Sequence, residues 1–191
     1  MRPSAFPLVL CAVLGLAASA TPASAADKYS GFLCCNLRTD GSWASDNNYA
    51  ENGKRILPVG TPVEVTGYGR YRTHIRVDGQ KQSIGNDYSR DLDDAAFTKR
   101  WVVTEDPKTK IAGYPEKIKT AIANAQITKG MTREQVLMSL GYPMSSENPN
   151  LDAKIWRYWR SSFSEFQVQF NGDRVSDVTT DPQTKNLIWV D

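Results

Sequence analysis

The chain has 191 residues, with 23 lysine or arginine and 21 aspartate or glutamate residues, so its formal net charge is +2. The basic residues are interspersed with acids, and nucleic-acid binding, which needs clustered cations to neutralise phosphates, is therefore not expected. The length suits one domain or two small ones.

The first 25 residues have the pattern of a secretory signal peptide. One basic residue precedes the apolar run "FPLVLCAVLGLAA", and "ASA" at residues 23–25 places small residues before a cleavage site at Ala26. The run is short for a membrane span, and no second one follows. Bulky residues before Cys11 and before the later cysteines argue against a lipid anchor. We predict export to the periplasm by a cleavable signal peptide, with association with the outer membrane as an open alternative.

Two adjacent cysteines, Cys34 and Cys35, stand in "GFLCCNLR". This segment predicts a strand, in which neighbouring side chains point to opposite faces. We expect Cys35 to be buried beside Leu33 and Leu37, and Cys34 to be more accessible. Exported proteins meet an oxidising environment. We expect unbonded thiols, with a disulfide between the two neighbours and a bond to another chain as the alternatives.

Residues 30–104 have the pattern of a β domain. Alternation in "TPVEVTGYG" and in "YRTHIRVDGQKQSIG" predicts strands, with a hairpin turn at Asp78-Gly79. A closing strand is predicted at residues 100–104. Short strands at close spacing, joined by tight turns, predict a small barrel.

The segment "DPKTKIAGYP" breaks this pattern and is predicted to be a linker. Two helices are expected after it. The first begins at Pro115, because proline suits the first helical position. The second has a complete start signal, in which Thr132 can cap the helix and Gln135 can reach back to form a capping box. Gly141 is expected to end this helix.

Three strands are predicted next, in "KIWRYWR", "EFQVQF" and "RVSDVTT", with a hairpin at Asn171-Gly172 between the last two. A further short strand is expected in "LIWV" near the end. Helices followed by strands imply an antiparallel sheet with helices packed on one face. The predicted fold class is α+β, a small N-terminal β-barrel followed by an α-α-β-β-β two-layer domain.

The C-terminal pattern resembles a known family. "KGMTREQVLMSLGYP", followed by "IWRYWR" and "FQVQFNGDRVSDV", is similar to the SmpA/OmlA (BamE-like) domain of outer-membrane biogenesis proteins, over about residues 115 to 180. The same layout also occurs in β-lactamase-inhibitor-like domains. Members of the assembly family are typically lipoproteins, whereas this chain lacks the lipid-attachment pattern and carries an extra N-terminal domain.

The N-terminal half is similar to a bacterial SH3-like barrel, because in "ILPVGTPVEV" a Pro-x-Gly turn precedes a strand. The resemblance implies binding of cell-wall material or protein segments, as is common for such modules of exported proteins. The predicted organisation is a signal peptide at 1–25, an SH3-like β domain at 26–105, a linker at 106–114 and a BamE-like domain at 115–191.

No catalytic site, metal site or cofactor is expected. His74 is predicted to be a half-buried or surface strand residue, with a thiolate–imidazole pair involving Cys34 or Cys35 as the alternative. Adjacent cysteines have the wrong spacing for zinc and for a Cys-x-x-Cys disulfide exchanger. The acidic cluster of Asp91, Asp93 and Asp94 lacks the spacing of a calcium loop, and Asp91 or Asp93 is expected to cap a short helix.

The leading hypothesis is a non-enzymatic exported envelope protein, a binding or scaffolding module in outer-membrane or cell-envelope biogenesis. Its predicted partners are envelope proteins, including the outer-membrane assembly machinery, or cell-wall material. Tyr142, Trp156 and Tyr158 are the candidate binding residues, although Trp156 and Tyr158 share a strand face and are expected first as core. The alternatives are a thiol-based redox enzyme or sensor using Cys34 and Cys35, and an inhibitor of a secreted enzyme.

Overall fold

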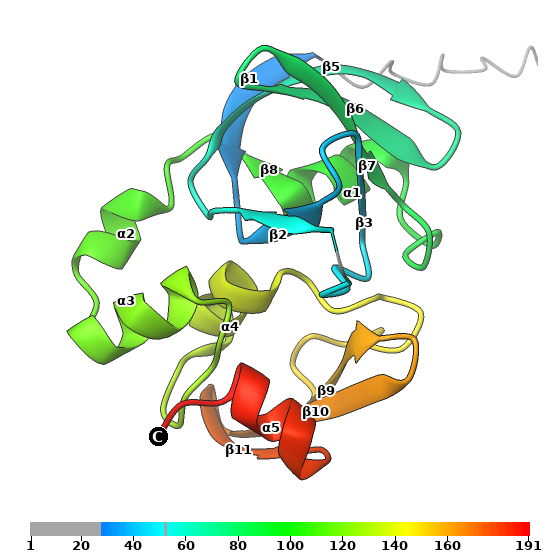
Figure 1. Ribbon diagram of the computed structural model, residues 1–191. Coiled ribbons are helices and arrows are strands. Elements are labelled where there is room, and N and C mark those ends of the chain that lie inside the picture. The colour runs from blue at the N-terminus through cyan, green and yellow to red at the C-terminus, as the bar shows by residue number, and fades with distance from the viewer. Residues whose placement is uncertain (1–27, 52) are drawn as a thin grey trace, which may run out of the picture.

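The computed structural model describes residues 28–51 and 53–191. The predicted signal peptide and Cys11 lie outside these residues. Among the described residues, no helix is both long and apolar enough to span a membrane. The α+β class is confirmed, since a curled β structure in the N-terminal half lies above a unit of helices and antiparallel strands in the C-terminal half (Figure 1).

A six-stranded sheet forms most of the N-terminal half. Its strand order is β3-β7-β6-β5-β1-β8, and all pairs are antiparallel except β3 with β7. The strands are β1 (Tyr29–Leu33), β3 (Trp43–Ser45), β5 (Pro62–Gly69), β6 (Arg72–Val77), β7 (Gln80–Gly85) and β8 (Val102–Val103). A separate pair joins β2 (Leu37–Thr39) to β4 (Arg55–Leu57).

Alternation along β5 and β6 explains the core of this half. Valine and isoleucine at every second position are buried there, at Val63, Val65, Ile75 and Val77. The predicted hairpin at Asp78-Gly79 is confirmed, because Val77 pairs with Gln80 across it. Both turn residues have positive φ, +49° and +77°, as a tight two-residue turn requires.

The closing strand predicted at residues 100–104 is mostly wrong. Helix α1 (Asp94–Trp101) includes its first two residues, and β8 is only two residues long. The Asp93 carboxylate caps α1 by accepting the Ala96 N–H at 2.7 Å. This confirms that one of the two aspartates Asp91 and Asp93 caps a short helix. Phe97 and Trp101, four residues apart, lie on the same helix face and are both 1 % exposed. The helix thus buries both aromatic rings on one face.

The C-terminal half has the predicted order of two helices and three strands. These are α3 (Glu116–Ala123), α4 (Arg133–Leu140), β9 (Ile155–Ser161), β10 (Ser164–Asn171) and β11 (Arg174–Thr179), with sheet order β11-β10-β9. The capping box at the start of α4 is confirmed, since the Thr132 and Gln135 side chains each accept the other's backbone N–H. A short helix, α2 (Lys108–Ala112), lies within the segment predicted as a linker.

The strand predicted in "LIWV" is wrong. Helix α5 (Pro182–Ile188) covers its first two residues, and only an isolated bridge from Trp189 to Ile127 follows. The helix has a start signal that the prediction overlooked. The Asp181 carboxylate accepts the Thr184 N–H at 2.9 Å, and Pro182 occupies the first helical position.

Buried apolar side chains form two clusters, one in each half, and each cluster includes a contribution from the other half. Val59, just after β4, belongs to the cluster built by α3, α4 and β9–β11. Tyr142, just after α4, packs against the cluster of the N-terminal sheet. The two halves are therefore joined by packing as well as by the chain.

Candidate functional site

A pocket of about 250 Å³ lies between the two halves. The N-terminal half contributes Cys34 and residues 103–107, and the C-terminal half contributes residues from α2, α4 and the turn after α4. Its apolar lining residues are Cys34, Val103, Pro107, Leu137, Met138 and Tyr142, and its charged ones are Glu105, Asp106, Lys110 and Glu134. Such a pocket, apolar with a few polar groups, is the usual form of a small binding site.

Helix α4 presents one face to the pocket. Glu134, Leu137 and Met138 are three or four residues apart and so lie on the same side of the helix. Lys110 of α2 donates to Glu134 at 2.6 Å, and this hydrogen bond raises the pKa of Lys110. Both side chains are exposed, so the pair adds little stability, but it does link α2 to α4 beside the pocket.

Tyr142 enters the pocket because α4 ends directly before it. Gly141 has φ +84°, a conformation that glycine adopts easily, and the chain turns there toward the N-terminal half. The Arg100 guanidinium lies 5.3 Å from the centre of the Tyr142 ring, within cation–π range. Burial raises the pKa of Tyr142, although Arg100 opposes this effect. The phenol therefore stays protonated near neutral pH and can donate a hydrogen bond.

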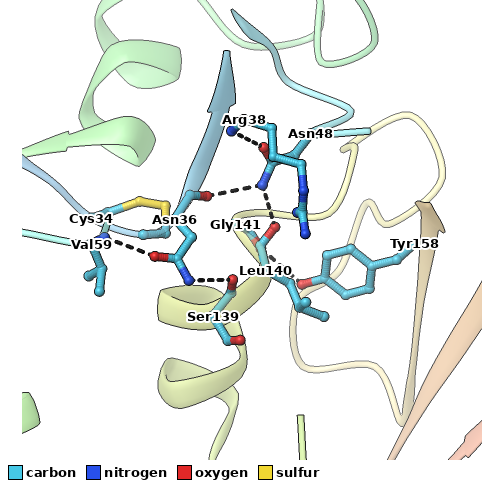
Figure 2. Close-up of a disulfide and its surroundings, with 10 residues drawn as sticks. Cys34, Asn36, Arg38, Asn48, Val59, Ser139, Leu140, Gly141 and Tyr158 are labelled. Carbon is cyan, nitrogen blue, oxygen red and sulfur yellow. Dashed lines mark hydrogen bonds between the residues drawn. A yellow bond between two sulfur atoms is a disulfide. The ribbon is translucent and has the colours of Figure 1, made fainter. Parts of the chain in front are cut away.

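Cys34 and Cys35 are joined by a disulfide (Figure 2). The structure thus differs from the unbonded thiols expected of a continuous strand. Strand β1 ends at Leu33, and the chain bends through the two cysteines before β2 begins. Cys35 is fully buried, as predicted, whereas Cys34 is half-buried and lines the pocket.

Asn36, the next residue, connects this bend to α3 and α4. Figure 2 shows its contacts with Ser139 of α4 and with Val59. Its amide nitrogen donates to the carbonyls of Ile122 at 2.6 Å and Ser139 at 3.1 Å. Its amide oxygen accepts the Val59 N–H at 2.9 Å. The two carbonyls lie in the last turns of α3 and α4, where carbonyls no longer receive the regular helical hydrogen bond. The Ile122 carbonyl also accepts the Ala125 N–H at 3.0 Å.

Asn48 completes the end of α4. Its amide nitrogen donates to the Leu140 carbonyl at 2.8 Å and to the Asn36 carbonyl at 3.0 Å, while its oxygen accepts the Arg38 N–H at 2.7 Å. The Met138 carbonyl accepts the Asn36 N–H at 3.0 Å. Three of the last four carbonyls of α4 are therefore satisfied by the N-terminal half. Sequence reasoning missed both asparagines.

Trp156 and Tyr158, two of the candidate binding residues, lie in the core. They are 1 % and 6 % exposed, and their rings pack on Phe170 and Phe166 respectively. The Tyr158 hydroxyl donates to the Gly141 carbonyl at 3.0 Å, and burial raises the pKa of this phenol well above its usual value. This burial corrects the idea that the two rings form a contact surface. Tyr142 lines the Cys34 pocket, whereas Tyr158 contributes to the lining of a second pocket near the end of α4.

His74 lies half-buried in β6, as predicted, with its Nδ1 2.8 Å from the Ser83 hydroxyl oxygen. It is not among the residues that line the Cys34 pocket. In the part of the chain that the structure describes, no three His, Cys, Asp or Glu residues come together in a group that could hold a metal ion.

Residues 119–180 match the family model of the outer membrane protein assembly factor BamE domain. The C-terminal half carries a BamE-like domain. The matched segment runs from within α3 to just past the end of β11, and it confirms the resemblance seen in the sequence. Comparisons with curated proteins and with solved structures found no match. Within the pocket, Glu134, Leu137, Met138 and Tyr142 belong to the BamE-like segment, whereas Cys34 and residues 103–110 do not.

Proposed function

We propose that this protein is a non-enzymatic, periplasmic envelope protein whose BamE-like domain binds a protein of the outer-membrane assembly machinery. The observation that carries the proposal is the family match at residues 119–180. The signal-peptide pattern of residues 1–25 supports the exported location in this proposal.

The N-terminal half serves, in this proposal, as an SH3-like module spanning residues 26–105. Its short, curled antiparallel strands support the assignment. Since Asn36 and Asn48 fasten it to the ends of α3 and α4, the two modules present one joint surface to a partner. A binding protein gains affinity when its contact residues are held in place before the partner arrives.

The pocket lined by Cys34, Leu137 and Tyr142 is the proposed contact point. It can accept an apolar side chain of the partner, while the Tyr142 hydroxyl offers a hydrogen bond. Aromatic residues at the centre of an interface commonly carry much of the binding energy. Its charged lining residues would orient the partner segment around this anchor.

The experiment is affinity capture of the full-length protein from crosslinked envelopes, followed by mass spectrometry. We expect components of the outer-membrane assembly machinery, and we expect Tyr142→Ala to reduce their recovery at least about tenfold. Tyr88→Ala is the matched control, because Tyr88 is 45 % exposed and does not line the pocket. Recovery of cell-wall material alone would contradict the proposed protein partner. Equal recovery of the partner with Tyr142→Ala and Tyr88→Ala would contradict the proposed contact point.

A thiol-responsive site is a second candidate function, favoured by the position of the disulfide on the pocket wall. An incoming thiolate would attack the accessible sulfur of Cys34. The Cys34–Cys35 bond would break as a mixed disulfide forms on Cys34, and Cys35 would leave as a thiolate that takes a proton from water. The reverse attack by Cys35 expels the incoming thiol and restores the original bond.

This second candidate predicts which sulfur reacts. In a Cys35→Ala variant treated with oxidised glutathione, the folded protein should acquire one glutathione on Cys34, as measured by intact mass and peptide mapping. In a Cys34→Ala variant the fully buried Cys35 should react only on unfolding. Unmodified Cys34 in a folded Cys35→Ala protein rules out this role.

A further inference from the structure

A second pocket between the two halves contains two arginines, one from each half. It has a volume of about 170 Å³, and its lining includes Arg38, Asn47, Asn124, Trp159 and Arg160. Arg38 comes from β2 and Arg160 from β9, so the charges are supplied by opposite halves of the protein. Asn48 and Tyr158 also line this pocket, which shares no lining residue with the Cys34 pocket.

The strand pattern explains why both arginines reach the space between the two halves. On β9, Trp156, Tyr158 and Arg160 alternate along one face, so Arg160 continues the core-facing row of the strand. On β2, Arg38 lies between two fully buried neighbours and points away from them. Figure 2 shows its side chain running past Asn48 toward Tyr158.

Both guanidinium groups are half-buried and unpaired. Across residues 28–51 and 53–191, neither takes part in an ion pair, and neither side chain donates a hydrogen bond. Burial and the nearby charge of Arg160 lower the pKa of Arg38. A guanidinium still remains charged at neutral pH. Two like charges in a partly desolvated pocket cost stability unless an anion compensates them.

We propose that this pocket binds a phosphate or sulfate group. A doubly charged oxyanion neutralises both guanidinium groups, whereas a carboxylate neutralises only one. Arginine presents several N–H donors in a planar fork that matches such oxygens and binds them with short, charge-assisted hydrogen bonds. The Asn47 amide oxygen already accepts the Tyr49 N–H, which leaves the amide nitrogen of Asn47 as a further donor.

The pocket is small enough to hold a single oxyanion group and not a large ligand. Because Arg38 and Arg160 belong to different halves, the bound anion would also tie the N-terminal sheet to β9. The site is independent of the proposed protein partner, since no residue of the Cys34 pocket takes part.

The test is isothermal titration of the purified full-length protein at constant ionic strength. The probes are inorganic phosphate and glycerol 1-phosphate, with acetate as a singly charged comparison. We expect saturable one-to-one binding of phosphate, and acetate binding at least about tenfold weaker. Arg38→Gln and Arg160→Gln should each weaken phosphate binding at least about tenfold, the factor expected for loss of one charge-assisted hydrogen bond.

Arg70→Gln is the matched control, because Arg70 is exposed after β5 and does not line the pocket. It should leave phosphate binding unchanged. Arg38→Lys keeps the positive charge and should retain part of the affinity for phosphate. It is the control for a loss of binding caused by misfolding of Arg38→Gln. Circular dichroism verifies the fold of each variant.

Absence of phosphate binding to the wild-type protein in the millimolar range overturns the proposal. Binding that either folded glutamine variant leaves unchanged also overturns it. Equal binding of both phosphate probes supports a site for the terminal group of a larger molecule, whereas binding of the inorganic ion alone supports a free-ion site. Failure to capture an assembly-machinery protein has no bearing on these outcomes.

Discussion

Asn36 and Asn48 show how single side chains can join two halves of a chain. Each makes three hydrogen bonds while 1 % and 6 % exposed, respectively. A buried amide contributes to stability only when its donors and acceptor are all satisfied, and loss of one member leaves its former partners desolvated and unpaired. The contact between the two halves therefore depends on the orientation of both asparagine side chains.

Replacing Asn36 by alanine is expected to lower the free energy of unfolding by about 2–4 kcal/mol. The Ser139 carbonyl and the Val59 N–H lose their side-chain partner, and the Ile122 carbonyl keeps only its bond from the Ala125 N–H. Urea unfolding measures this change. Asn186→Ala is the control, since Asn186 is exposed on α5, and a change within about 0.5 kcal/mol is expected there. Similar losses in both variants would show that Asn36 has no special role.

Asp46 is a buried carboxyl group that should make stability depend on pH. It is 2 % exposed and accepts the N–H groups of Asp87 and Tyr88 at 3.1 and 3.0 Å. Burial raises its pKa in spite of these hydrogen bonds. The folded protein therefore holds this proton more tightly than the unfolded chain, whose pKa is near 3.8. The corresponding stability is full below that value and is lost as the pH rises through the raised pKa.

We expect Asp46→Asn to reduce the fall in stability between about pH 4 and pH 7, because an amide does not ionise. Urea unfolding at a series of pH values gives this slope. Asp78→Asn, in the exposed hairpin turn, should leave the wild-type slope unchanged. Parallel profiles for wild type and Asp46→Asn would mean that Asp46 has an ordinary pKa.

At the scale of residues, the sequence predicted positions whose role follows from neighbours along the chain. The burial of Cys35 beside Leu33 and Leu37 follows from strand alternation, and Asp93 follows from helix-cap chemistry. Asn36 could not be predicted, because its partners at residues 122 and 139 are 86 and 103 positions away. The disulfide depended on where β1 ends, which the apolar pattern does not show.

At the scale of elements, the start of α4 is the clearest case of local chemistry deciding structure. The Thr132 hydroxyl accepts the Gln135 N–H at 3.3 Å, and the Gln135 side chain accepts the Thr132 N–H at 2.9 Å. The opposite end of the helix relies on Asn36 and Asn48. One end of α4 is thus specified within four residues of sequence and the other by a distant part of the fold.

Thr132→Ala should destabilise the protein by about 1 kcal/mol, because it removes the side-chain acceptor of the capping box. Thermal or urea unfolding measures the change. Thr120→Ala on the exposed side of α3 is the matched control and should change stability by less than about 0.5 kcal/mol. Equal effects of the two substitutions would show that the capping box contributes no measurable stability.

The two incorrectly predicted elements have a shared cause. Short apolar runs such as "RWVV" and "LIWV" fit a strand or the end of a helix equally well, and periodicity alone does not separate the two over so few residues. In both cases an aspartate several residues upstream caps the N-terminus of a helix that extends into the run. These caps are Asp93 and Asp181. The long strands β5, β6, β9 and β10 had enough alternating positions to be predicted from sequence.

At the scale of the whole molecule, both described pockets lie where the two halves meet. The family match covers residues 119–180 and so accounts for only one side of each pocket. The other side comes mainly from the N-terminal half, whose contacts with α4 include the long-range hydrogen bonds of Asn36 and Asn48. The resemblance predicted the layout of the C-terminal half, but the pockets required the folded arrangement of both halves.

This junction predicts that the two halves unfold as one cooperative unit. Val59 packs in the C-terminal cluster and Tyr142 against the N-terminal one, and three carbonyls at the end of α4 depend on Asn36 and Asn48. Opening either half would leave these groups exposed or unpaired, so unfolding of one half alone is costly in free energy.

Hydrogen exchange measured by mass spectrometry over increasing denaturant should give free energies of opening for β6 and β10 that agree within about 1 kcal/mol. In Asn48→Ala, which leaves the Leu140 carbonyl without its partner, both values should fall together. Exchange of one sheet well before the other in the wild-type protein would show instead that the halves are separate folding units.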